Sequence, residues 1–275
     1  VAALAVQDGL AADAQAAQRL LAGKDRAWIA QYLRGRSAAQ IMRLPYDQPD
    51  LRKKAAGGWN DGQVVAVDAR AAFEQGQLAP IPMMIGTTRD EAKLLAGVYR
   101  ISPAEMFNLM LHSDPDARPT VRTSDIIAPY MLPSLGSWLY DHYTAAITWA
   151  LKRGVNQSIA AVAAHDPQVW VYRFDWDRAP EPWHTVYGAA HGIDLPFVFG
   201  NFSTGFFAMD FSRANRPGRE ALSQLMMQSI GAFMRTGDPN TPQLPLRWQQ
   251  WGGAGKSHAQ MIFDASDELP QLTIE

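Results

Sequence analysis

Cysteine is missing from the 275 residues of this sequence. Its absence excludes disulfide bonds, thiolate metal sites and a cysteine nucleophile. It does not decide the cellular compartment, because many exported bacterial proteins also lack cysteine. An excess of charge of one sign is missing too, since 25 Lys and Arg stand against 27 Asp and Glu, for a formal net charge of −2. Nucleic-acid binding would need a basic stripe, so we expect no nucleic-acid partner.

Long apolar runs are also absent. No stretch reaches the roughly 18 apolar residues that a membrane span requires, so we expect a soluble protein whose compartment stays open between secreted, periplasmic and cytoplasmic. The chain opens at Val1 with an Ala-rich segment that has neither a basic start nor a small-residue cleavage site. That segment indicates a helix already under way. Either this is a mature protein after processing, or the chain begins inside a larger polypeptide.

What is present indicates a globular α/β protein. Hydrophobic residues make up 47% of the chain and charged residues 19%, which speaks against disorder. Three segments predict strands: "IPMMIGTT" at 81–88, "VWVYRFDW" at 169–176 and, more weakly, "AQMIFD" at 259–264. Helices are predicted over 10–22, 25–44, 69–75, much of 124–154, and 218–240 with its end at Gly237.

The predicted strands do not make a complete sheet. The first two have the continuous apolar character of strands that are buried on both faces of a parallel sheet. Interior strands need hydrogen-bonded neighbours on both sides. Because three strands in 275 residues cannot supply them, we expect further strands to come from elsewhere.

An acidic pair, Asp90 and Glu91, follows the first predicted strand through a Gly-Thr-Thr turn. Loops at the carboxyl ends of parallel strands carry the active groups of α/β folds. The alternative is a helix N-terminus whose dipole the two acids complement. The residues alone leave both interpretations open.

The segment "TVYGAAHGIDLPFVFG", residues 185–200, holds one histidine, His191, before an apolar run. His191 is either a hydrogen-bonded core residue or a group that transfers protons. A metal site is the weaker interpretation, because no ligand spacing surrounds it and His184 lies seven residues away. Nothing near the other histidines singles them out: His112, His142, His165 and His258.

A nucleophile motif is absent. The serine-hydrolase elbow reads G-x-S-x-G, and no segment of this chain matches it. The nearest candidates, Ser37 in "GRSAA", Ser203 in "NFSTG" and Ser257 in "GKSHA", each lack one of the two glycines.

Taken together, the two sites resemble a known family. "GTTRDEA" and, one hundred positions later, "GAAHGIDLPFVFG" look like the acid and histidine motifs of the type-B carboxylesterases, which include cholinesterases and bacterial p-nitrobenzyl esterases. Further segments, among them "YLRGRSAAQIM", "FMRTGDPN" and "MIFD", resemble the family in the same order, so the resemblance covers nearly the whole chain. One departure is Ala92, where the family often has Gly.

The resemblance implies an α/β-hydrolase fold and a Ser–His–Glu triad, in which Glu91 is the acid and His191 the base. Asp194 matches the family's acidic position three residues after the histidine and is expected to support the site. The implied reaction is carboxylic ester hydrolysis on a small-molecule ester, through an acyl-enzyme, with no metal and no organic cofactor. The aromatic residues suit either an apolar gorge or a core: Trp138, Trp149, Trp183, Phe202, Phe206 and Phe207.

The family's serine elbow and Gly-Gly oxyanion loop lie N-terminal to every segment matched here. The resemblance therefore implies that residues 1–275 form the C-terminal segment of a single α/β-hydrolase domain, with a mostly parallel sheet between helices. The N-terminal portion of the same enzyme would supply the serine and the first strands. The alternative is a non-catalytic cholinesterase-like binding or adhesion module, although both visible triad positions keep competent residues.

Overall fold

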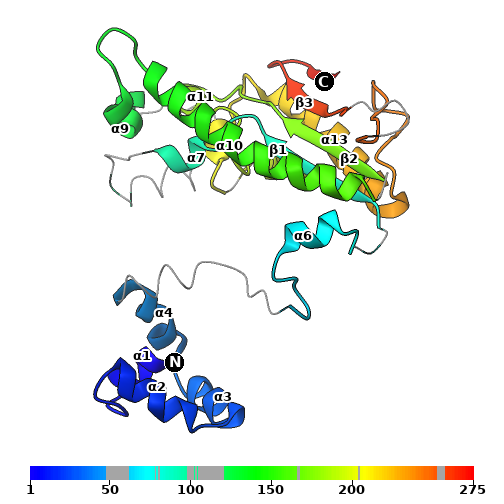
Figure 1. Cartoon of the computed structure of the whole chain (residues 1–275). Coiled ribbons are helices and arrows are strands. Elements are labelled where there is room, and N and C mark those ends of the chain that lie inside the picture. Colours follow the sequence, from blue (N-terminus) through cyan, green and yellow to red (C-terminus); the bar gives the residue numbers. More distant parts are fainter. Residues whose placement is uncertain are drawn as a thin grey trace. The chain divides into compact units, whose positions relative to one another are not determined.

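The computed structural model describes residues 1–47, 62–77, 79, 81–97, 102, 104, 121–165, 168–203, 205–252 and 258–275. The chain divides into two compact units, Val1–Val67 and Asp68–Glu275 (Figure 1). Each unit is considered by itself, and the single domain expected over 1–275 remains a prediction. Within the described residues, no helix combines the length and the apolar character needed to cross a membrane.

The first unit is helical: α1 (Ala2–Gln7), α2 (Ala14–Ala22), α3 (Arg26–Arg34) and α4 (Ala38–Asp47). Side chains cap three of these helices. Asp13 and Asp25 each accept a bond of 2.7 Å from the backbone N–H three residues ahead. Before α4, the Ser37 N–H donates to Gln40 at 2.9 Å and Gln40 N–H donates to the Ser37 hydroxyl at 3.2 Å, a reciprocal capping box.

The second unit contains the sheet. Its strands are β1 (Met83–Thr88), β2 (Val169–Phe174), β3 (Met261–Ala265) and β4 (Pro270–Ile274). Its helices are α6 (Ala69–Glu74), α7 (Lys93–Ala96), α9 (Thr123–Ile127), α10 (Trp138–Ala163), α11 (Trp183–Tyr187), α12 (Leu195–Phe199) and α13 (Arg216–Thr236), with short 3₁₀ turns at Ala128–Tyr130 and Ala208–Asp210. The strand order is β1-β2-β3-β4, parallel for the first three and antiparallel for β4.

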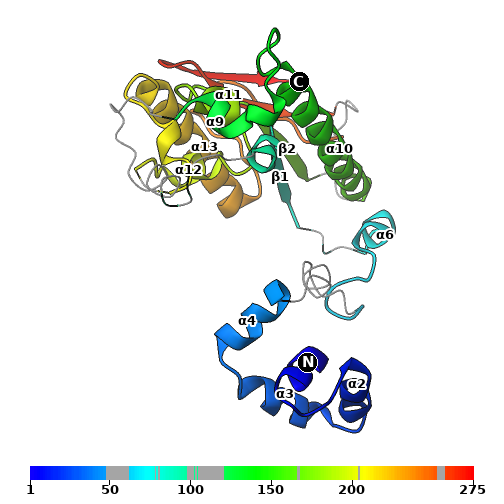
Figure 2. The same ribbon diagram turned by 90° about the vertical axis from the view of Figure 1, so that its left-hand side faces the viewer.

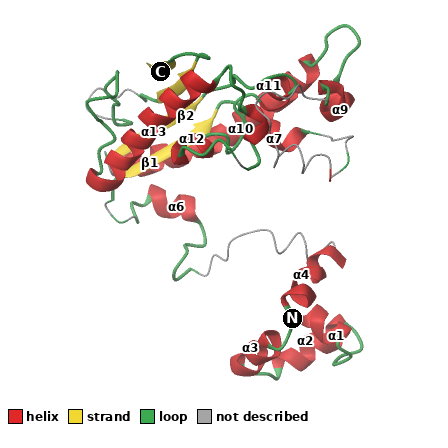
Figure 3. Ribbon diagram, turned by 180° about the vertical axis from the view of Figure 1, so that it is seen from behind, coloured by secondary structure: helices red, strands yellow, loops and turns green. Residues whose placement is uncertain are grey.

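Helices cover both faces of this sheet. Figure 2 shows α10 on one side of β1 and β2 and α13 on the other, and Figure 3, the view from behind Figure 1, shows α13 in front of the strands. The alternation of β2 explains the arrangement, because successive side chains of a strand point to opposite faces. Val169 and Val171 pack with Ile159 of α10, whereas Trp170 and Phe174 belong to the cluster that contains residues of α13.

All three predicted strands are confirmed, and a fourth was missed. β4 is short, half-exposed and interrupted by polar residues, so its apolar pattern is weak. β2 pairs on both sides, as an interior strand must. The side chains of Met83–Ile85 in β1 are only half-buried, because β1 forms the outer end of the described sheet.

The predicted helices 69–75 and 218–240 appear as α6 and α13. α13 begins two residues earlier than predicted and ends at Thr236. Gly237 then adopts a left-handed conformation with φ of 76°, which closes the helix as its position after the last turn predicts.

Candidate active site

Glu91 lies three residues beyond the end of β1, on the turn that leads to α7. Its Oε1 accepts a hydrogen bond of 2.7 Å from the backbone N–H of Thr88, the last residue of the strand. The Glu91 side chain is 14% exposed. The strand end thus holds one carboxylate oxygen and leaves the other available to a second partner.

His191 is that partner. Its Nδ1 lies 2.6 Å from Glu91 Oε2, across one hundred positions of sequence. Because a carboxylate only accepts hydrogen bonds, the contact assigns the ring proton to Nδ1 and leaves Nε2 as an acceptor. The His191 side chain is 68% exposed, so it is not a core histidine. Of the two interpretations left open by the sequence, the structure therefore supports an accessible imidazole held by a carboxylate.

Asp90 and Glu91 do not complement a helix dipole. α7 spans four residues, Lys93–Ala96, and has no acidic residue in its first turn. The Asp90 carboxylate instead accepts from the Arg89 guanidinium, at 2.9 Å, and from the N–H of Ala189, at 3.0 Å. The dipole alternative for this acidic pair is therefore wrong.

Two residues before Glu91, Arg89 is the centre of an ion-pair network. Arg89 donates to Asp90 and also to Asp177 Oδ2, at 2.6 Å. Burial opposes the charged guanidinium, but the two carboxylates outweigh it and raise the pKa of Arg89 above its usual value. Sequence reasoning missed Asp177, although a signal exists. Asp177 follows β2 by three residues as Glu91 follows β1, and adjacent parallel strands end at one edge.

Asp194, which the sequence predicts to support the site, has Tyr172 as its side-chain hydrogen-bond partner. The Tyr172 hydroxyl donates to Asp194 Oδ2 at 2.9 Å. Burial raises the pKa of Asp194, although the bond from Tyr172 works in the opposite direction. Burial and the carboxylate of Asp194 also raise the pKa of Tyr172. Asp194 begins the first turn of α12, so this bond ties the His191 segment to β2.

Four of the other histidines have structural partners. His184 contacts the Asp177 carbonyl at 2.6 Å, His142 the Trp138 carbonyl at 2.8 Å and His165 the Glu74 carbonyl at 3.0 Å. His258 packs against the Trp251 ring, with centroids 4.9 Å apart, and His112 lies outside the described residues. Across the described ranges, no group of three or more His, Cys, Asp or Glu is arranged to hold a metal ion.

Two of the serines weighed as nucleophiles have hydrogen-bond partners of their own. Ser37 caps α4, and the Ser203 hydroxyl donates to Asn201 at 3.4 Å. Ser257 lies outside the described residues. In the described part of the chain, His191 has no hydrogen bond to a serine.

An apolar cavity opens beside the histidine. It has a volume of about 360 Å³ and includes Gly192, the residue after His191. The other lining residues are Leu195, Pro196, Phe199, Asn201, Gly205, Phe206 and Phe207. Of the aromatic residues considered for a gorge, Phe206 and Phe207 line this cavity. Trp183 is a core residue, and Trp138 and Trp149 are exposed on α10.

Comparison with known proteins identifies the family of the chain that carries this site. The family model described as "Carboxylesterase family" matches residues 4–271, which is almost the whole chain. The chain belongs to the carboxylesterase family. Among curated carboxylesterase relatives, para-nitrobenzyl esterase of Bacillus subtilis is 26% identical over 66% of this chain and 34% of its own length. Human cocaine esterase is 24% identical over 88% of this chain and 42% of its own length.

Solved structures agree with the family assignment. A carboxylesterase of Geobacillus stearothermophilus, EST55, superimposes with a TM-score of 0.51 at 26% identity, over 80% of this chain and 43% of that one. A p-nitrobenzyl esterase structure gives a TM-score of 0.53 at 22% identity, over 95% of this chain and 51% of that one. The fold is therefore that of the α/β-hydrolase carboxylesterases, and the chain spans about a third to a half of these relatives.

Proposed function

We propose that this chain carries the acid and the base of a carboxylic ester hydrolase. Glu91 is the acid and His191 the base of a Ser–His–Glu triad, and the serine is supplied by an N-terminal portion of the same enzyme. The observation that carries the proposal is the contact of 2.6 Å between His191 Nδ1 and Glu91 Oε2, in an imidazole whose side chain is exposed.

The chemistry requires these residue types. A serine hydroxyl becomes an effective nucleophile when a base removes its proton. His191 Nε2 takes that proton and returns it to the leaving alcohol, while Glu91 holds the ring orientation and stabilises the imidazolium. Backbone N–H groups of the serine-bearing portion stabilise the oxyanion, and water then hydrolyses the acyl-enzyme. No metal or organic cofactor enters this scheme.

The substrate is a small-molecule ester with an apolar group. The cavity beside Gly192 supports this part of the proposal, because its lining is mainly aliphatic and aromatic. Its volume of about 360 Å³ is in the range of small-molecule sites. Phe206 and Phe207 are the aromatic residues that would contact the apolar group.

Two observations support an external serine. None of the serines in the chain stands in a G-x-S-x-G motif. β1 also forms the outer end of the described sheet, with half-buried apolar side chains, which suits pairing with a further strand.

The decisive experiment uses the protein from its natural source. Intact-mass and N-terminal analysis of the species that contains this chain should find a G-x-S-x-G serine, on the same or on an accompanying polypeptide. A fluorophosphonate probe should label that serine, and His191→Ala should lower kcat for p-nitrophenyl acetate by at least about 10³-fold. Near-normal turnover by the folded His191→Ala protein would refute the role of His191.

The second candidate, a non-catalytic binding module, predicts the opposite result. A protein of that kind would show no labelled serine and no ester turnover in the complete species. The competent Glu91–His191 pair favours the enzyme, because a binding module has no need of an oriented imidazole.

A further inference from the structure

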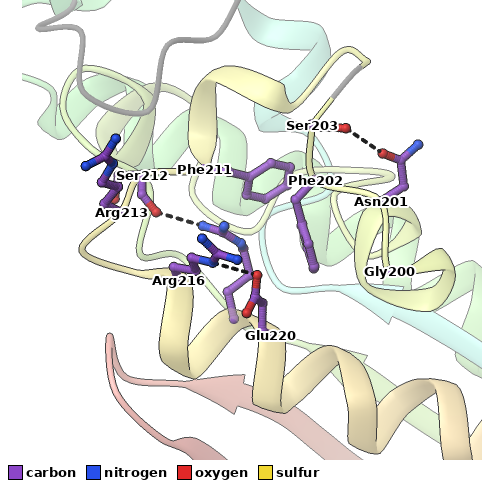
Figure 4. Close-up of a pocket in the computed structure, with 10 residues that line it drawn as sticks. Gly200, Asn201, Phe202, Ser203, Phe211, Ser212, Arg213, Arg216 and Glu220 are labelled. Atoms are coloured by element: carbon purple, nitrogen blue, oxygen red, sulfur yellow. Dashed lines mark hydrogen bonds and ion pairs between the residues drawn. The ribbon is translucent and has the colours of Figure 1, made fainter.

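A second cavity lies at the start of α13 and shares one lining residue, Asn201, with the cavity beside Gly192. Its volume is about 490 Å³, and neither Glu91 nor His191 lines it. It lies between the segment 200–203, the segment 211–213 and the first turn of α13 (Figure 4). The lining residues are Gly200, Asn201, Phe202, Ser203, Phe211, Ser212, Arg213, Arg216, Arg219 and Glu220.

The lining is rich in cations. Three of its ionisable side chains are arginines, and Glu220 is the single carboxylate among the lining residues. Arg216 Nε donates to Glu220 Oε1 at 2.8 Å, and both side chains are largely exposed. The opposite charges of Arg216 and Glu220 offset each other, so Arg213 and Arg219 give the lining a net positive charge.

Arg219 is built into the wall of the cavity. The residue is 6% exposed. Its Nη1 donates to the Ser212 carbonyl at 2.9 Å and to the Asn215 side chain. Its guanidinium carbon lies 4.8 Å from the ring centre of Phe202 and 5.1 Å from that of Phe211. The guanidinium is therefore held in a fixed plane before any ligand arrives.

The hydrogen-bonding and stacking partners of Arg219 are neutral, and the carboxylate whose charge acts on it, Glu220, is already bonded to Arg216. A carbonyl, an amide and two aromatic rings orient the guanidinium but do not balance its charge. Its Nε is buried and has no hydrogen-bond acceptor within the described residues. A buried guanidinium that bonds to no carboxylate among the described residues is costly, and an anion in the adjoining cavity would reduce that cost.

We propose that this cavity binds a small organic carboxylate with an apolar body. The two parallel N–H donors of an arginine guanidinium match the two oxygens of a planar carboxylate. A compact lysine ammonium would not offer this geometry. The side chains of Phe202 and Phe211 provide the apolar wall (Figure 4). The volume of about 490 Å³ accommodates a ligand of the size of an aromatic acid. The proposal does not depend on the ester hydrolase function, because it uses neither Glu91 nor His191 and shares only Asn201 with the lining of the cavity beside Gly192.

Benzoate is a suitable probe, and benzamide is its neutral counterpart of the same shape. Calorimetric titration of the 275-residue chain at constant ionic strength should show benzoate binding at least about tenfold more tightly than benzamide, since the neutral amide forms no ion pair with the guanidinium and offers it one acceptor oxygen in place of two. Arg219→Gln should abolish the preference, with folding checked by near-ultraviolet circular dichroism.

Glu220→Gln gives a test that a misfolded variant cannot imitate. It removes the carboxylate from the lining and releases Arg216, so benzoate should bind about three- to tenfold more tightly. The matched control for Arg219→Gln is Arg235→Gln, in the last turn of the same helix. This variant should leave binding unchanged. Failure of benzoate to bind, equal binding of benzamide, or no gain in Glu220→Gln would overturn the proposal.

Discussion

Asp90 and Ala189 exchange two hydrogen bonds. The Asp90 N–H donates to the Ala189 carbonyl at 2.9 Å, and the Ala189 N–H donates to the Asp90 carboxylate at 3.0 Å. Asp90 directly precedes Glu91, and Ala189 lies two residues before His191. The two segments that carry the acid and the base are therefore fastened to each other beside the reacting groups, independently of the Glu91–His191 contact itself.

Asp90→Ala should loosen this junction. It removes an acceptor of the partly buried Ala189 N–H, and we expect the free energy of unfolding to fall by about 1–3 kcal/mol. The His191 ring proton that faces Glu91 should also broaden or disappear from the low-field region of the proton NMR spectrum. Asp90→Asn keeps an acceptor oxygen and should restore most of that signal. Equal loss of the signal in both variants would show that the Ala189 contact does not position His191.

Glu91→Gln tests the acid in the complete, serine-bearing enzyme. The variant replaces an acceptor of the His191 Nδ1 proton by a neutral amide, so kcat should fall by about 10²- to 10⁴-fold. Glu268→Gln, on the surface, is the control for the same chemical change. An unaltered kcat for Glu91→Gln would contradict the triad.

The pH dependence of that enzyme follows from the base. Activity requires an imidazole that is free of its second proton, so kcat/KM should rise with pH over the range in which histidines ordinarily deprotonate, about pH 5 to 8. The measurement is initial-rate hydrolysis of a p-nitrophenyl ester in overlapping buffers. A flat profile over that range would argue against histidine as the base.

Gly86 is expected to be intolerant of a side chain. A Cβ at this position of β1 would lie 2.0 Å from Cζ of Tyr172, whose hydroxyl holds Asp194. Gly86→Ala should displace the ring and reduce the unfolding free energy by about 1–3 kcal/mol. Gly154→Ala in α10 is the matched control, since its Cβ would meet nothing within 4 Å. For Gly154→Ala, urea denaturation should show an unfolding free energy that is higher by about 0.5–1 kcal/mol.

Asp210 should make stability depend on pH. The residue is fully buried, its carboxylate oxygens have no hydrogen-bond partner within the described residues, and burial raises its pKa well above the usual value. A carboxyl with a raised folded-state pKa binds its proton more tightly when folded, so its stabilising effect is complete at low pH. That effect is lost as pH rises from the ordinary Asp pKa towards the folded-state value.

Asp210→Asn removes this dependence. Relative to the variant, the unaltered chain should lose up to about 1.4 kcal/mol per pH unit over that window. Thermal or urea unfolding from pH 4 upward measures the difference, with Asp267→Asn on the surface as control. Parallel stability curves for Asp210→Asn and the unaltered chain would contradict the expectation.

Local pattern was enough for the main strands and several helices. The apolar runs around Met83 and Val169 and the weaker one at Met261 each formed the strand they predict. Two helix ends also depend only on residues close in sequence. Ser37 and Gln40 cap the start of α4, and Gly237 ends α13. β4 was missed because its stability comes from antiparallel pairing with β3 rather than from its own residues.

By itself, the sequence determined which chemistry is available: a histidine before an apolar run, an acidic pair after a predicted strand, no thiol, and no serine elbow among the 275 residues. Only the tertiary structure decided that Glu91 faces His191, that Asp90 joins their segments and that the described hydrogen-bond partners of Arg219, beside a cavity, are neutral. The reason is physical. Propensity and periodicity act over a few residues, whereas these contacts link distant segments that the parallel pairing of β1 with β2 and the docking of α13 bring together.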